Sequence, residues 1–212
     1  MDDVARQRAV FTDHITMMDA VNAEEVVRIE TGQAFRDHFG GPYAVIHRVD
    51  IHATVWEAAL THPGVKYRTS THIVDIRQTP DDVTVFDEQG NSWTADILVG
   101  CDGVKSVVRR APVAHYMAQG ACMAPEDAVT LGKALERCGG DAQQAFALYE
   151  SVRIPRTARI VWSTREMGRL YHVAGVERQV RNLLWKGKSQ KAFYLNIEWL
   201  YGWKEDNCLE PR

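Results

Sequence analysis

The segment Ile97–Arg109 holds residues whose types and spacing suit ligand chemistry. An apolar run leads into Asp102-Gly103, and Ser106 and Arg109 follow at the predicted start of a helix. Glycine lets the backbone approach a ligand closely, the N–H groups of a helix N-terminus bind phosphate oxygens, and the Asp102 carboxylate can accept a hydrogen bond from a ribose hydroxyl. The pattern favours a dinucleotide site, although Asp-Gly is also an ordinary turn pair.

A second segment places Arg48 between a β-prone run, Tyr43–His47, and a helical pattern, Ile51–Leu60. An arginine at such a junction can clamp a pyrophosphate with two hydrogen bonds. The alternative is a surface arginine paired with Asp50 or Glu57.

A third segment begins a helix with the small residues Gly120 and Ala121. Free N–H groups there could meet a carbonyl-bearing ring or a developing negative charge. Close packing of this helix on a neighbour is the alternative. The histidines show no metal-ligand spacing such as HExxH, so we expect no metal site, and no residue is assigned as a catalytic base.

The elements around these segments indicate an α/β protein. Short β-prone runs separated by turn residues predict a small antiparallel meander. Its runs are Val65–Tyr67, Thr71–Ile76, Val83–Phe86 and Ser92–Thr94. The continuous apolar run Ile97–Val99 is typical of a strand buried on both faces of a parallel sheet.

After Pro112 the sequence predicts helices as far as Trp203. Ala121–Cys138 carries apolar residues at helical intervals, and Asp141 is a candidate N-cap for the next helix. Pro155 is expected to kink that helix or to begin a new one. The aromatic residues of Phe193–Trp203 are expected to pack on the rest of the fold or on a partner subunit.

Composition excludes several classes of protein. The chain has 212 residues, 45% hydrophobic and 25% charged, with a formal net charge of -3, so no strong field draws it to nucleic acid or an anionic membrane. No apolar run approaches the ~20 residues of a membrane-spanning helix. Four scattered cysteines without a CxxC predict reduced thiols in the cytoplasm.

Taken in order, the three segments resemble those of the single-component FAD-dependent aromatic-ring monooxygenases. GGPYAVIHRVDIHATVWEAA is similar to the stretch with an FAD-contacting arginine, here Arg48. ADILVGCDGVKSVVRR is similar to the Asp-Gly motif that serves FAD and the nicotinamide, here Asp102 and Gly103. HYMAQGACMAPEDAVTLGKAL is similar to the start of the helix beneath the isoalloxazine ring, where Gly120 and Ala121 would contact the pyrimidine side.

The resemblance covers essentially the whole chain and implies an enzyme. FAD, NAD(P)H and O₂ would hydroxylate a phenolic aromatic acid such as 3-hydroxybenzoate or salicylate, with His115 and Tyr116 toward the substrate. The implied fold is a partial FAD-binding, glutathione-reductase-like Rossmann sheet over residues 1–140, with a helical C-terminal region over 141–212. That region is a candidate homodimer surface.

The sequence differs from this family in two respects. The sequence has no GxGxxG loop, whose helix N-terminus would hold the ADP pyrophosphate. Arg109-Arg110 runs almost directly into Ala111–His115, where the family has a substrate-covering sheet. The sequence therefore predicts an N-terminal truncation and an internal deletion. A non-catalytic remnant of such an enzyme is the alternative function, and a plain nucleotide-binding module is disfavoured because no phosphate loop is present.

Overall fold

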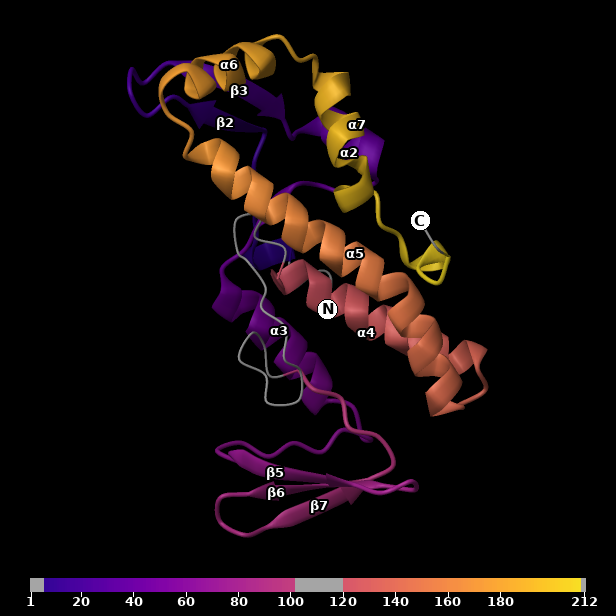
Figure 1. Cartoon of the computed structure of the whole chain (residues 1–212). Helices are drawn as coiled ribbons and strands as arrows, with labels where there is room; N and C mark the ends of the chain where they lie inside the picture. The colour runs from indigo at the N-terminus through magenta and orange to yellow at the C-terminus, as the bar shows by residue number, and fades with distance from the viewer. Residues whose placement is uncertain (1–5, 102–119, 211–212) are drawn as a thin grey trace. The chain divides into compact units, whose positions relative to one another are not determined.

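The computed structural model describes residues 6–101 and 120–210 (Figure 1). The chain divides into two compact units. The larger unit comprises residues 1–56 and 114–212, and the smaller comprises residues 57–113. This division follows packing and does not test the functional boundary predicted at residue 140.

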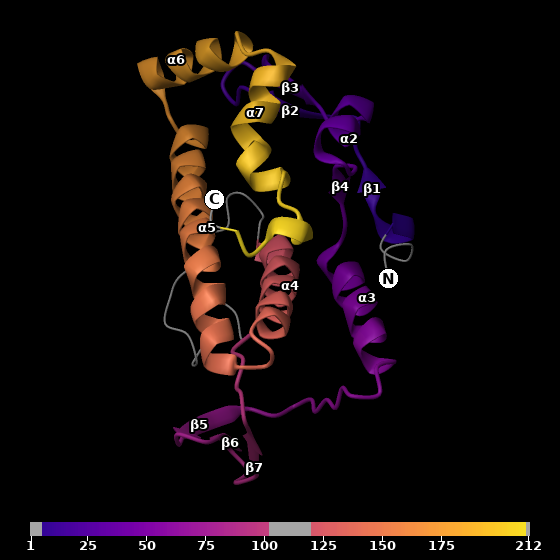
Figure 2. The same ribbon diagram turned by 90° about the vertical axis from the view of Figure 1, so that its right-hand side faces the viewer.

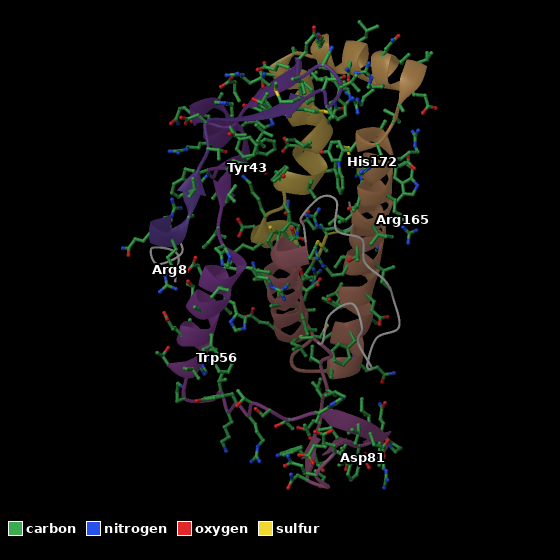
Figure 3. The ribbon with its side chains drawn as sticks, turned by 90° about the vertical axis from the view of Figure 1, so that its left-hand side faces the viewer. Arg8, Tyr43, Trp56, Asp81, Arg165 and His172 are labelled. Atoms are coloured by element: carbon green, nitrogen blue, oxygen red, sulfur yellow. The ribbon has the colours of Figure 1, made fainter. Side chains whose placement is uncertain are left out.

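The smaller unit holds the predicted meander. Strands β5 (Ile73–Gln78), β6 (Val83–Asp87) and β7 (Ser92–Ala95) pair antiparallel in the order β5-β6-β7, which confirms three of the four runs predicted for the meander. Figure 3 labels Asp81 at the turn between β5 and β6. At the next turn the Asp87 carboxylate accepts hydrogen bonds from the backbone of Gln89 and Asn91.

Two strand predictions are wrong: the first run of the predicted meander and the buried strand predicted to follow it. Residues 65–67 form no strand. Residues 97–99 also form no strand, and the side chain of Val99 is 52% exposed. An apolar run becomes a buried strand only where neighbouring strands pair with it. All strand pairings in the described residues are antiparallel, so these residues show no parallel sheet for Ile97–Val99 to join.

The larger unit begins with two small antiparallel sheets. In one, β1 (Val10–Phe11) pairs with β4 (Ala44–Val45), and in the other, β2 (His14–Met18) pairs with β3 (Glu25–Glu30). Helix α2 (Gln33–Phe39), which the sequence analysis missed, lies between β3 and β4. Gly40 ends this helix in the left-handed conformation, with φ of 80°, which glycine adopts without steric cost.

Two helices pack on β3 (Figure 2). Helix α6 (Gly175–Lys186) is held through Asp19, which accepts hydrogen bonds from Arg178, Asn182 and the backbone of Val21. Helix α7 (Gln190–Tyr201) is held through the side chains of Gln190 and Tyr194. The Gln190 amide bonds the Glu30 N–H and the Arg28 carbonyl, at 3.0 and 2.7 Å.

An aromatic core joins α2 to α7. The C-terminal aromatic residues therefore pack on the rest of the fold, which is one of the two predicted alternatives. Phe35, Phe39 and Tyr194 are buried together. Tyr43 and Tyr201 pack against them, with the rings of Phe35 and Tyr201 5.8 Å apart. The Tyr194 hydroxyl donates to the Glu30 carbonyl at 2.6 Å, which satisfies the polar end of a buried ring.

Helices α4 (Gly120–Arg137) and α5 (Ala142–Tyr171) lie side by side (Figures 1 and 2). Asp141 is the N-cap of α5, as predicted, and its side chain accepts from the Gln144 N–H at 3.0 Å. The helix continues through Pro155 to Tyr171, so no new helix begins at the proline. In the described residues no helix is long and apolar enough to span a membrane.

Candidate functional site

Arg48 is the first residue of α3 (Arg48–Leu60), as the sequence predicted for a strand-to-helix junction. The preceding residue, His47, caps this helix. Its carbonyl accepts from the N–H groups of Asp50 and Ile51, and its Nδ1 accepts from the Val49 N–H at 3.3 Å. The Arg48 side chain is exposed, and within the described residues it forms no ion pair. Its guanidinium is therefore available to an anion.

Helix α4 begins at Gly120, as predicted, and Ala121 is its second residue. The first four N–H groups of an α-helix have no partner within the helix. Within the helix itself, the N–H groups of Gly120 and Ala121, the two residues expected to contact a flavin, therefore have no partner.

Pro125 lies inside α4. Proline has no N–H, so the carbonyl of Ala121 lacks the partner it would have in a regular helix. That carbonyl points toward the C-terminal end of the helix, whereas the N–H groups of the first turn point toward its N-terminus. The two carbonyl oxygens on the pyrimidine side of a flavin can therefore be met by the N–H groups only.

The other predicted site residues lie outside the described part of the chain. These are Asp102 and Gly103, expected at the cofactor, and His115 and Tyr116, expected toward the substrate. Ser106 and Arg109 of the same motif also lie there. Their placement stays a prediction.

A buried ionic network, missed by the sequence analysis, fixes the position of α4. Glu126 accepts two hydrogen bonds from Arg156, at 2.7 and 2.8 Å, and one from Arg153 at 2.8 Å. Arg153 also donates to Asp127 at 2.7 Å. Arg156 also donates hydrogen bonds to two carbonyl oxygens at the end of α7, that of Trp199 at 2.7 Å and that of Leu200 at 3.2 Å.

The network is nearly closed to solvent. The side chains of Arg153 and Glu126 are 4% and 11% exposed. Burial by itself disfavours the charge of Arg153, but its hydrogen bond to Glu126 and the charge of Asp127 outweigh that effect and raise its pKa. Arg153 is therefore charged at neutral pH.

The network anchors the helix close to the predicted flavin contacts. Glu126 follows Gly120 by six residues, roughly 9 Å along the helix axis. A rigid anchor within two turns of an N-terminus holds its backbone groups in a fixed direction, as a binding site requires.

One signal in the sequence could have revealed this network. Arg153, Arg156 and Arg159 recur every three residues, which places them along one side of a helix. Glu126-Asp127 is the acidic pair of the preceding helix. The pairing itself requires α4, α5 and α7 to be packed together, which their spacing does not show.

Comparison with known proteins places these features in a family. No family model matches the sequence. A 3-hydroxybenzoate 6-hydroxylase of Klebsiella oxytoca is 54% identical over 335 residues, which cover 99% of this chain and 84% of the relative. The chain belongs to the 3-hydroxybenzoate 6-hydroxylase family. Members of this family are aromatic-ring monooxygenases, as the sequence motifs predicted.

Two further relatives carry the same name. A 3-hydroxybenzoate 6-hydroxylase of Polaromonas naphthalenivorans is 34% identical over 330 residues, covering 97% of this chain and 82% of the relative. The 3-hydroxybenzoate 6-hydroxylase 2 of Aquipseudomonas alcaligenes is 32% identical over 293 residues, which cover 79% of this chain and 92% of the relative.

The length of the alignment confirms the internal deletion. The alignment with the Klebsiella oxytoca enzyme extends over 335 residues, whereas this chain has 212. More than a third of the aligned part of that relative therefore has no counterpart in this chain.

Proposed function

We propose that this chain is part of an FAD-dependent monooxygenase that hydroxylates a phenolic aromatic acid with NAD(P)H and O₂. Its named relatives act on 3-hydroxybenzoate, so we propose this acid as substrate, with salicylate as the second compound to test. The observation that carries the proposal is the N-terminus of α4. The N–H groups of its first turn would donate to the carbonyl oxygens on the pyrimidine side of a flavin, and a buried network holds the helix.

Bound FAD would supply the oxygen-transfer chemistry, while the chain would hold and orient it. Arg48 would pair with the pyrophosphate, because its guanidinium is exposed at a helix start and forms no ion pair with described residues. Gly120 and Ala121 would bond the pyrimidine side through their backbone. Asp102 and Gly103 would contact FAD and the nicotinamide, and His115 and Tyr116 would face the substrate, as the family motifs imply.

We further propose that residues 1–140 are a partial FAD-binding domain of the glutathione-reductase-like Rossmann type, and that 141–212 form a helical C-terminal region. The family membership supports the first part. The helices α5, α6 and α7 support the second.

An absorbance spectrum tests flavin binding directly. The purified chain would be scanned from about 300 to 550 nm before and after incubation with FAD and desalting. We expect a retained flavin band, and then oxidation of NADH or NADPH that 3-hydroxybenzoate stimulates. A folded chain that retains no flavin would contradict the proposal.

A pair of variants tests the role of Arg48. Loss of a charge-assisted hydrogen bond weakens binding by about 1.5–3 kcal/mol, so Arg48→Gln should weaken FAD binding tenfold or more. Arg165→Gln is the matched control, because Arg165 is an exposed arginine of α5 (Figure 3). Equal FAD affinity in the two variants would remove Arg48 from the site.

A non-catalytic remnant is the second candidate, and two observations favour it. More than a third of the aligned relative is missing, and large apolar side chains of α5 are exposed: Ile154 is 62% exposed and Trp162 is 67% exposed. Monomeric proteins rarely expose large apolar patches. A remnant would bind no flavin, and it would show no oxidation of NADH or NADPH with any phenolic acid.

A further inference from the structure

A cavity of about 240 Å³ lies between α5, α7 and the C-terminal segment. Two indole side chains, Trp199 and Trp203, and three arginines line it, together with the carboxylate of Glu210. A cavity of roughly 150 Å³ can hold benzene, so this one has room for a single substituted aromatic ring.

Only one of the three arginines has unused charge. Arg153 and Arg156 are neutralised by Glu126 and Asp127 in the buried network. Arg159 is exposed and, within the described residues, forms no ion pair. Its guanidinium carbon lies 4.2 Å from the centre of the Trp199 ring. A guanidinium stacked on an indole keeps its in-plane N–H groups free, and these donors match a carboxylate in two-point geometry.

We propose that this cavity is a second ligand site, which binds a small aromatic monocarboxylate such as benzoate. The carboxylate pairs with Arg159, and the ring lies against Trp199 and Trp203. The Glu210 carboxylate opposes a second negative charge, so a dicarboxylate such as phthalate should bind less well. The site uses residues of α5, α7 and the C-terminal segment, none of which is a predicted flavin contact.

Calorimetric titration of the purified chain with benzoate tests the proposal without flavin or activity. One exposed arginine and two ring contacts are expected to give a Kd on the order of 1 mM. Arg159→Gln should weaken this binding at least tenfold, while Arg165→Gln and Arg48→Gln should leave it within twofold. Cyclohexanecarboxylate and phenol, which lack the ring and the charge respectively, should bind more weakly than benzoate.

Three outcomes of this titration would overturn the proposal. One is no saturable binding at about 20 mM benzoate. Another is equal binding by the wild type and Arg159→Gln. Loss of binding in Arg48→Gln but not in Arg159→Gln would also overturn it, because it would assign the benzoate to the proposed flavin region.

Nuclear magnetic resonance supplies a test on the wild-type chain alone. The six tryptophans carry six indole N–H groups, and the signals of Trp199 and Trp203 can be assigned from triple-resonance spectra of the wild type. Benzoate should shift these two signals and leave those of the four other tryptophans, Trp56, Trp93, Trp162 and Trp185, in place. Shifts confined to the other tryptophans would refute the site.

Discussion

Replacement of Glu126 by glutamine tests the network that anchors α4. Glu126→Gln keeps the shape of the side chain but removes the negative charge between two arginines. Removal of one partner from a buried ion pair costs about 3–5 kcal/mol. Arg153 retains Asp127, and the glutamine carbonyl can still accept one bond, so we expect a loss of about 3 kcal/mol in the free energy of unfolding.

Urea unfolding followed by circular dichroism at 222 nm measures this loss. With a slope of about 2 kcal/mol per molar urea, the midpoint should fall by about 1.5 M. Glu136→Gln is the matched control, since Glu136 is an exposed residue of the same helix and should change stability by no more than about 0.5 kcal/mol. Because buried pairs are poorly screened, the difference should persist in about 0.5 M NaCl.

The reasoning fails if Glu126→Gln loses no more stability than Glu136→Gln. A double-mutant cycle with Arg156→Gln sharpens the result. Residues in direct contact should show a coupling energy of about 0.5–3 kcal/mol. A coupling near zero would mean that Glu126 and Arg156 do not interact as the structure places them.

Three further predictions concern pH and assembly. The backbone N–H of Val21 and the side chains of Asn182 and Arg178 lower the pKa of Asp19 to about 2. Its stabilising contribution is therefore complete above about pH 4 and lost as the pH falls through 2, and Asp19→Asn should flatten this acid limb in urea titrations. Burial raises the pKa of Tyr201, so its contribution to stability holds below about pH 10 and is lost at higher pH; Tyr201→Phe should remove one late-titrating phenol from absorbance at 295 nm. The candidate homodimer would use α6, where Leu183 is 71% exposed, so Leu183→Glu should convert a dimer to a monomer in light scattering, and an unchanged mass would exclude this surface.

Much of the fold could be predicted because its signals are local. The meander has turn residues between short β-prone runs, and Asp141 is followed by a helical pattern, so both features could be inferred from neighbours in sequence. Helix α2 was missed because it is short and its apolar residues, Phe35 and Phe39, are only one turn apart. It is stabilised by α7, which lies far along the chain.

The errors have a common physical cause. Ile97–Val99 has the composition of a buried strand, but burial depends on partners that three residues do not specify. At Pro155 only one of the two predicted alternatives is excluded: no new helix begins there, because packing of the long helix outweighs the loss of one backbone hydrogen bond. At the candidate site, Arg48 and Gly120 were correctly placed at helix starts, whereas the Glu126 network requires three helices to come together.

The bonds from α7 to β3 also protect the outer edge of a sheet. An unpaired strand edge is a template on which a second chain can add a strand. Gln190 and Tyr194 occupy the backbone groups of Arg28 and Glu30 on that edge. A chain that ends before Gln190 would leave this edge open, and its β2–β3 hairpin would then serve as a starting point for intermolecular β-aggregation.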